Sequence, residues 1–296
     1  MRYHIERAHY MRFSAPAREH HIQIRLAPWH DQTQSVIRMG LKVDPEVHAA
    51  AAYDGFGNLF HHFAILAAHD ELRFKIEAEV ETRCANPFDF ALIPSERELA
   101  WITERLHQAP RLWDLILHRS LMTPALPGEI DGHPVPRLQE GQQLIDQVQA
   151  LMRWTRDLIA YEPAKAERAA ELASALDAGA GSAEDLAHLL IAVTRQWQIP
   201  ARFVSGYLDA AYFESGTCED GDPPPQQLHH WAEVLIPGTG WIGFDPALGL
   251  LADATYVRVA VGRDAQDTQP IKQSCRSEGM AAEVDERLSV SRLGAS

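Results

Sequence analysis

The first third of the chain alternates apolar and polar side chains, which is the period of a half-buried strand. This pattern predicts strands over residues 21–26, 36–43, 59–65 and 72–80. Residues 54–58, Asp-Gly-Phe-Gly-Asn, supply the positive-φ residues of a tight turn just before the strand predicted over 59–65. Several strands in succession are typical of an antiparallel sandwich or barrel.

Helical spacing replaces the alternation after residue 96. Residues 97–106 and 112–119 have helical composition, whereas 124–136 carry four prolines and indicate a loop. Residues 139–161 repeat apolar side chains at helical spacing, and 166–178 form another helix-forming run. We place a domain boundary in the proline-rich stretch. The predicted organisation is an N-terminal β domain with a helical extension over 1–135, a core over 136–278, and a flexible polar tail over 279–296.

The second half contains the best-defined helix of the chain, over residues 184–197. Leu186, Leu189, Leu190, Val193 and Trp197 form one apolar stripe along it. A buried strand is predicted over 199–208, then a polar loop, then two strands over 231–236 and 240–244. The predicted fold is therefore α+β, with a β domain followed by a helix packed on an antiparallel sheet.

Composition limits the possible partners and compartments. The chain has 296 residues, 46% hydrophobic and 23% charged, with a formal net charge of −14. The negative charge argues against a nucleic-acid groove or an anionic membrane surface as partner. The first residues are charged where a secretion signal is apolar, and no apolar stretch approaches the roughly 18 residues of a membrane span. Three widely spaced cysteines form no zinc or disulfide pattern, so we expect a cytoplasmic protein.

Three segments carry residues suited to acyl-transfer chemistry. His229 opens one predicted strand and Asp245 ends the next, so a hairpin would bring the two side chains together. Ala183 precedes the long helix, after Gly179 and Gly181. A helix N-terminus offers free N–H groups and a favourable dipole, which lower the pKa of a thiol and can stabilise an oxyanion.

These segments resemble the catalytic blocks of the bacterial transglutaminase-like cysteine enzymes, a papain-related group. The resemblance rests on Gly-Ser-Ala-Glu-Asp from 181, His-His-Trp-Ala-Glu-Val from 229 and Gly-Trp-Ile-Gly-Phe-Asp-Pro from 240. Residues 202–207, 259–264 and the turn at 54–58 also resemble parts of this family, so most of residues 1–270 is covered. The family carries a nucleophilic Cys where this chain has Ala183.

The resemblance implies a protease or amidase that acts on peptide or side-chain amides through a thioester, with His229 as base and Asp245 orienting it. It implies a peptide or protein substrate and no metal or organic cofactor. Transamidation, with an amine in place of water, is an alternative. Ala183 has two explanations: a natural pseudoenzyme that binds peptides, or a Cys→Ala substitution in an active enzyme. The intact His229, Asp245 and glycine approach favour the substitution.

Other residues near these blocks could have either a structural or a functional role. The candidates that could line the site are Ser182, Asp185, His230, Trp231 and Trp241. Asp185 is also explained as a helix-start charge, and the tryptophans as core. Adjacent histidines in strands point to opposite faces, so we expect no metal site. Cys218 lies in a loop without a helix behind it and is an unfavourable nucleophile. The loop 209–228 is acidic, which favours a substrate with a positive charge.

Overall fold

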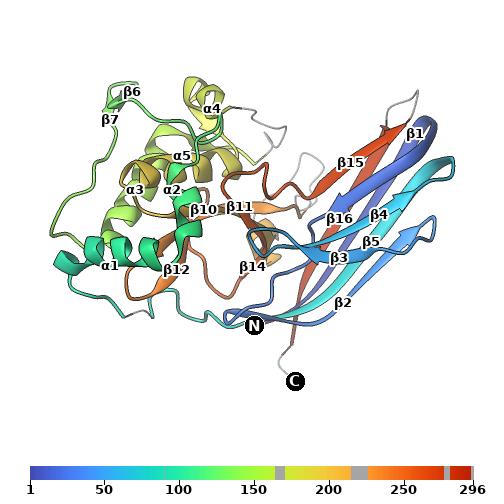
Figure 1. The fold of residues 1–296 in the computed structure, drawn as a ribbon, viewed down its shortest axis with the longest axis horizontal. Coiled ribbons are helices and arrows are strands. Elements are labelled where there is room, and N and C mark those ends of the chain that lie inside the picture. Colours follow the sequence, from blue (N-terminus) through green and yellow to red (C-terminus); the bar gives the residue numbers. More distant parts are fainter. Residues whose placement is uncertain (90, 164–170, 215–225, 277–280, 295–296) are drawn as a thin grey trace.

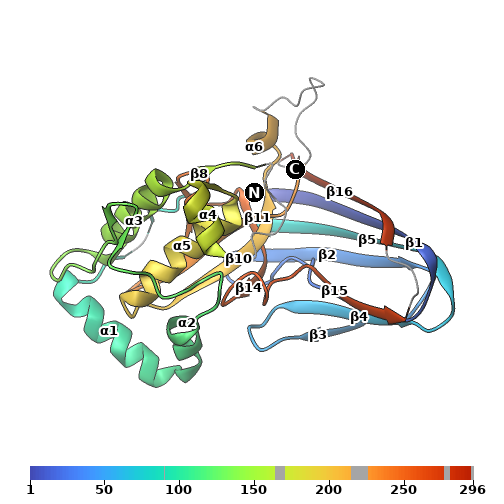
Figure 2. The same cartoon turned by 90° about the horizontal axis from the view of Figure 1, so that it is seen from above.

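The computed structural model describes residues 1–89, 91–163, 171–214, 226–276 and 281–294. Long strands gather on one side of the molecule and the helices on the other, in both views (Figures 1 and 2). The α+β class is confirmed, with 23% helix and 43% strand.

The β side is built around one long strand, β1 (Arg2–Ile24). Its first half pairs with β5 (His69–Thr82) and β16 (Ala281–Leu293), and its second half with β4 (Leu59–Ile65) and β15 (Ile271–Arg276). The outer strands β2 (Gln34–Asp44) and β3 (Ala50–Tyr53) extend the two halves. The register shifts between Arg12 and Ala17, where β1 passes from one set of partners to the other. All these pairs are antiparallel.

Strand β1 begins nineteen residues before the predicted strand at 21–26. Inward-facing positions early in β1 include Arg7 and His9, which interrupt the apolar pattern that sequence reasoning relies on. Both are buried because β16 supplies a partner: Arg7 Nη2 lies 2.8 Å from Glu286, and His9 Nδ1 lies 3.1 Å from the same carboxylate. The His9 ring also stacks on Phe74. A buried strand can therefore look polar when its charges are paired across strands.

The expectation of a flexible tail over 279–296 is wrong for the described residues. Residues 281–293 form β16, which pairs with β1 along nearly its whole length and lies beside it in Figure 1. Most side chains of this edge strand stay exposed, so its sequence lacks the apolar alternation of a core strand. Val290 is 1% exposed, and Leu288 and Leu293 are half-buried.

The core is a five-stranded antiparallel sheet covered by helix α5 (Ala183–Gln196). Its strand order is β13-β12-β11-β10-β14. In chain order, the strands are β10 (Ala201–Leu208), β11 (His229–Ile236), β12 (Gly240–Asp245), β13 (Leu250–Leu251) and β14 (Tyr256–Gly262).

The remaining elements surround α5 and the sheet. The helices are α1 (Ser95–Gln108), the 3-10 turn η1 (Pro110–Trp113), α2 (Asp114–Leu117), α3 (Leu144–Leu158), α4 (Leu172–Ala178) and α6 (Ala211–Glu214). The short strands are β6 (Glu129–Ile130) with β7 (His133–Pro134), and β8 (Ala160–Tyr161) with β9 (Ala180–Gly181).

The helical extension that precedes residue 135 packs against the core. Residues of α1, η1 and α2, such as Ile102, Leu112 and Ile116, share one apolar cluster with α3 and α5. The proline-rich loop contributes Val135 to the same cluster. The helical extension therefore belongs to the core. The C-terminal strands, in turn, return to the β domain, so neither unit is continuous in sequence.

Two side-chain amides join the β domain to the edge strand β14. Gln34 donates to the Arg258 carbonyl and accepts from the Arg258 N–H, at 2.8 and 2.9 Å. Asn58 makes the same reciprocal pair with Val261, both at 2.7 Å. Each amide imitates the backbone of a neighbouring strand, so the sheet edge is satisfied without another strand.

We predict that β16 stabilises the whole fold through Val290, which packs with Tyr3 of β1 and Val257 of β14. Val290→Ala removes two buried methyl groups and should lower the free energy of unfolding by about 2 kcal/mol. Urea unfolding followed by circular dichroism measures this. The matched control is Val284→Ala on the same strand, where the side chain is 53% exposed and the expected loss is under about 0.5 kcal/mol. Equal losses in the two variants would contradict the assignment.

Candidate functional site

The N-terminus of α5 is fixed by a reciprocal cap. Asp185 accepts from the Ser182 N–H and the Ser182 hydroxyl, both at 2.8 Å, and the Asp185 N–H donates to the Ser182 hydroxyl oxygen. Gly181 must be small here, because a Cβ would lie 3.0 Å from the Asp185 side chain and 3.1 Å from that of Ile159. Ser182 and Asp185, two candidate site residues, therefore hold the helix start. Ala183 is the first residue of the helix and is 6% exposed.

His229 and Asp245 lie together as the hairpin argument predicts. His229 Nε2 is 2.7 Å from Asp245 Oδ2, and both side chains are buried. The other carboxylate oxygen, Oδ1, accepts from the N–H groups of Ala247 and Leu248 at 2.9 and 3.1 Å. The loop after β12 thus turns back to bind the carboxylate, which satisfies a charge that has no access to water.

The chain topology brings the helix start to the same end of the sheet as this pair. Helix α5 leads into β10, and β11 is antiparallel to β10, so α5 and β11 run in the same direction. Ala183 and His229 are the first residues of these two elements. Tyr161 supports the placement: it pairs with Gly181, and burial together with the nearby charge of Asp245 raises the pKa of its phenol.

The hydrogen bond to Asp245 determines which ring nitrogen of His229 can do chemistry. An ionised carboxylate only accepts, so Nε2 must carry the proton that it donates. In the neutral ring Nδ1 is then the basic nitrogen, and it makes no hydrogen bond to the described residues. The arrangement has the geometry of the histidine–acid pair of hydrolytic triads, in which the acid sets the tautomer of the ring.

Tyr256, the first residue of β14, is a member of this cluster that sequence analysis missed. Its hydroxyl donates to Asp245 Oδ2 at 2.8 Å, and its ring packs edge-on against Trp231. Burial and the Asp245 charge raise the pKa of this phenol. The only signal nearby in the sequence was the family resemblance over 259–264, which begins three residues after Tyr256.

His230 lies on the opposite side of the strand from His229, toward α5. Its ring stacks on Phe203, which also stacks on His188 of α5. Burial lowers the pKa of both His188 and His230 to about 3, and the neighbouring His229 adds to the effect at His230. His188 Nε2 accepts from the Ala265 N–H at 3.2 Å, which requires a neutral ring. These two histidines are core residues of the helix–sheet interface.

The two candidate tryptophans have different positions. Trp231 is 1% exposed, and the absence of side chains at Gly206 and Gly243 makes room for its indole. It lies beside the His229 ring, at 6.5 Å between centroids. Trp241, expected as a possible site wall, pairs with Leu235 near the hairpin turn, about 13 Å along the strand from Asp245. It stacks on the Arg202 guanidinium, and its role there is to bury an ion pair between Arg202 and Glu233.

The acidic loop and the cysteines add little to the described site. Asp209 is 8% exposed and accepts a hydrogen bond from Tyr3 at 2.8 Å, so its charge faces the β domain. Cys218 and the loop acids Glu219, Asp220 and Asp222 lie outside the described residues. Cys84 and Cys275 are free thiols. Within the described ranges, no three His, Cys, Asp or Glu side chains are grouped to bind a metal.

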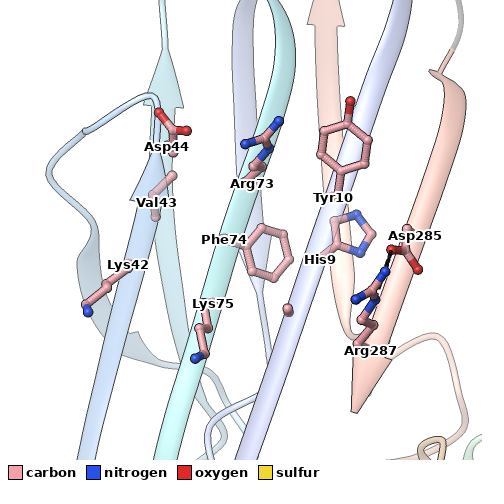
Figure 3. A pocket seen from close by; sticks show the side chains of 11 residues that line it. His9, Tyr10, Lys42, Val43, Asp44, Arg73, Phe74, Lys75, Asp285 and Arg287 are labelled. Carbon is pink, nitrogen blue, oxygen red and sulfur yellow. Dashed lines mark hydrogen bonds and ion pairs between the residues drawn. The ribbon is translucent and has the colours of Figure 1, made fainter.

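A hollow of about 400 Å³ lies on the β domain, over Ala8 of β1 (Figure 3). Its walls include four cationic side chains, and three of them already have acidic partners: Arg73 with Glu71, Lys75 with Glu77, and Arg287 with Asp285. These pairings leave little charge for an anionic ligand, so we do not assign a function to this hollow.

Comparison with known families agrees with this geometry. Residues 135–246 match the transglutaminase-like superfamily. The core is transglutaminase-like. Residues 3–81 match the bacterial transglutaminase-like N-terminal region, so the β domain also has counterparts in this group.

Similar proteins extend the likeness to the whole chain. A candidate cysteine protease from Cytophaga hutchinsonii has a similar fold, with a TM-score of 0.63 and 18% identity over 100% of this chain and 92% of its own. An uncharacterised protein of Mycobacterium leprae is 27% identical over 95% of both chains. One from Mycobacterium tuberculosis is 24% identical over 83% of this chain and 79% of its own. These likenesses support a shared architecture and name no substrate.

No helix in the described parts of the chain is long and apolar enough to cross a membrane.

The buried His188 makes a testable contribution to pH-dependent stability. Its ring stays neutral in the folded protein down to a pKa of about 3, whereas in the unfolded chain it titrates near 6.5. The unfolded state therefore binds more protons as pH falls below about 6.5, and stability is lost toward acid. From pH 7.5 to 5.0 the unmodified protein should lose about 2 kcal/mol more than His188→Gln. Urea unfolding at the two pH values tests this.

The exposed His107 of α1 provides the matched control. His107→Gln should show the same pH-dependent loss as the unmodified protein, because the substitution leaves the buried His188 ring in place. If His188→Gln and His107→Gln gave the same slope, the neutral buried ring would not be the cause.

Proposed function

We propose that the chain carries the catalytic frame of a transglutaminase-like cysteine hydrolase that acts on peptide or side-chain amides, with Ala183 at the nucleophile position. The observation that supports this is the buried 2.7 Å hydrogen bond between His229 and Asp245, at the end of the sheet where α5 begins. The transglutaminase-like match over residues 135–246 contains all three positions.

With Cys at 183, the reaction would follow from the roles of these groups. His229 Nδ1 takes the thiol proton, and the sulfur attacks the amide carbonyl carbon. N–H groups of the first turn of α5 stabilise the oxyanion. Collapse breaks the C–N bond, and the imidazolium gives its proton to the leaving amine. His229 then deprotonates water, which attacks the thioester and releases the acid and the thiol. An amine in place of water would give transamidation.

With Ala183 the same frame can bind an amide but cannot form the thioester. Removal of the sulfur leaves the helix cap and the His229–Asp245 pair with their hydrogen bonds. This supports the second candidate function, a natural pseudoenzyme that holds a peptide without cutting it. The residue that the natural gene encodes at 183 separates the two: Cys favours the hydrolase, and Ala favours the binding module.

Restoring the thiol tests the catalytic frame. In Ala183→Cys, the helix N-terminus and His229 should lower the thiol pKa, so iodoacetamide should modify position 183 at least about tenfold faster than the exposed Cys275 at pH 6.5. Peptide mapping by mass spectrometry gives the rate at each cysteine. The restored enzyme should also cleave amide bonds in a peptide library.

The control is the double variant Ala183→Cys with His229→Gln, which keeps the helix terminus and removes the base. It should lose most of the rate advantage and all of the turnover. A thiol at 183 that reacts no faster than Cys275 would overturn the proposed cysteine chemistry. A fast thiol without any cleavage would favour the binding module.

A further inference from the structure

We propose that Tyr256 is a positioning residue of the site, which holds Asp245 and limits how strongly that carboxylate stabilises a charged His229 ring. The catalytic role of Tyr256 rests on the proposed function. Its effect on Asp245 and His229 does not, and can be measured in the chain with Ala183.

The geometry places the Tyr256 hydroxyl and the His229 ring on one oxygen atom. Asp245 Oδ2 accepts from Tyr256 at 2.8 Å and from His229 Nε2 at 2.7 Å. Oδ1 is engaged by two backbone N–H groups of the following loop. Each donor fixes a different direction around the carboxylate, so its plane cannot rotate without breaking a buried hydrogen bond.

Tyr256 is itself held in place. The side chain is 5% exposed and packs edge-on against Trp231, with ring centroids 5.3 Å apart. Tyr212 of α6 packs near its other side, at 6.1 Å, and bonds Thr255 at 3.1 Å. Because burial and Asp245 keep the phenol protonated, it acts as a donor throughout the pH range in which a histidine titrates.

Tyr256 and His229 compete for hydrogen bonding to the same negatively charged oxygen of Asp245. A hydrogen bond to a carboxylate stabilises the ionised form and makes its oxygen less basic. The imidazolium therefore gains less from Asp245 than it would without Tyr256. In a thiol enzyme, this balance sets how readily His229 gives its proton to the leaving amine.

Other titratable groups surround the pair without sharing this oxygen. Tyr161 of β8, Tyr212 of α6, Asp253 before β14 and His230 beside His229 interact electrostatically with one or more members of the cluster. Among the described residues, only Tyr256 and His229 donate to Asp245 Oδ2. This makes the effect of the Tyr256 hydroxyl separable from the general field of the site.

The test follows the His229 ring by NMR in the chain with Ala183, using isotope-labelled histidine and assigning the signal by its loss in His229→Gln. Tyr256→Phe removes the competing donor and should move the midpoint of the His229 titration up by about half a pH unit. Replacing Tyr256 with 3,5-difluorotyrosine strengthens the donor at unchanged shape and should move the midpoint down. Opposite shifts from the two changes are the expected signature.

Tyr212→Phe is the matched control, because it removes a hydroxyl one ring away that does not touch Asp245. It should leave the midpoint in place. The proposal would be overturned if Tyr256→Phe and the fluorinated protein shifted the His229 midpoint no more than this control does. It would also be overturned if Tyr256→Phe lowered the midpoint and the fluorinated protein raised it. The fluorinated protein also keeps the test decisive if Tyr256→Phe does not fold. Since no thiol is involved, an unreactive Ala183→Cys protein would refute the proposed chemistry without changing this result.

Discussion

The buried carboxylate of Asp245 is the constraint on which the geometry of the site depends. It is 0% exposed, so its charge must be compensated entirely by protein groups. The four donors come from the start of β11, from the loop after β12 and from the start of β14. One carboxylate thus links three segments that are also joined by the sheet, by the packing of Tyr256 on Trp231 and by the Arg258–Glu233 ion pair. The orientation of His229 is a consequence of this local stabilisation.

Contacts between the β domain and the core sheet also stabilise those three segments. Gln34 and Asn58 close the exposed edge of β14, and the Arg258 side chain reaches Glu233 of β11 and Asp31 of the β domain. The Arg258 guanidinium lies over Trp29, and Glu233 is also paired with Arg202, which lies over both Trp29 and Trp241. Because Glu233 is buried, loss of either arginine is costly. The β domain therefore supports the five-stranded sheet at its β14 edge.

Much of the architecture could be predicted from the sequence, because local patterns carry it. Strand β4 coincides with the predicted 59–65, and the His229–Asp245 pairing follows from hairpin length alone. The failures share one physical cause: they involve partners distant in sequence. Arg7 and His9 are buried because Glu286 is present on β16, and β16 is ordered because β1 is beside it. Tyr256 joins the site across the sheet, where no local spacing could reveal it.

Ala183 begins α5 without taking part in the hydrogen bonds that hold the site together. The residue at a helix terminus affects the fold only where other groups depend on its side chain. Here the cap uses Ser182 and Asp185, and the His229–Asp245–Tyr256 cluster is satisfied by its own hydrogen bonds. Neither part needs a thiol to fold. Yet a buried imidazole beside a buried carboxylate costs more to desolvate than an apolar pair of similar volume, so stability alone gives no reason to keep it. The proposed function supplies such a reason, because the reaction would use the buried imidazole and its carboxylate partner.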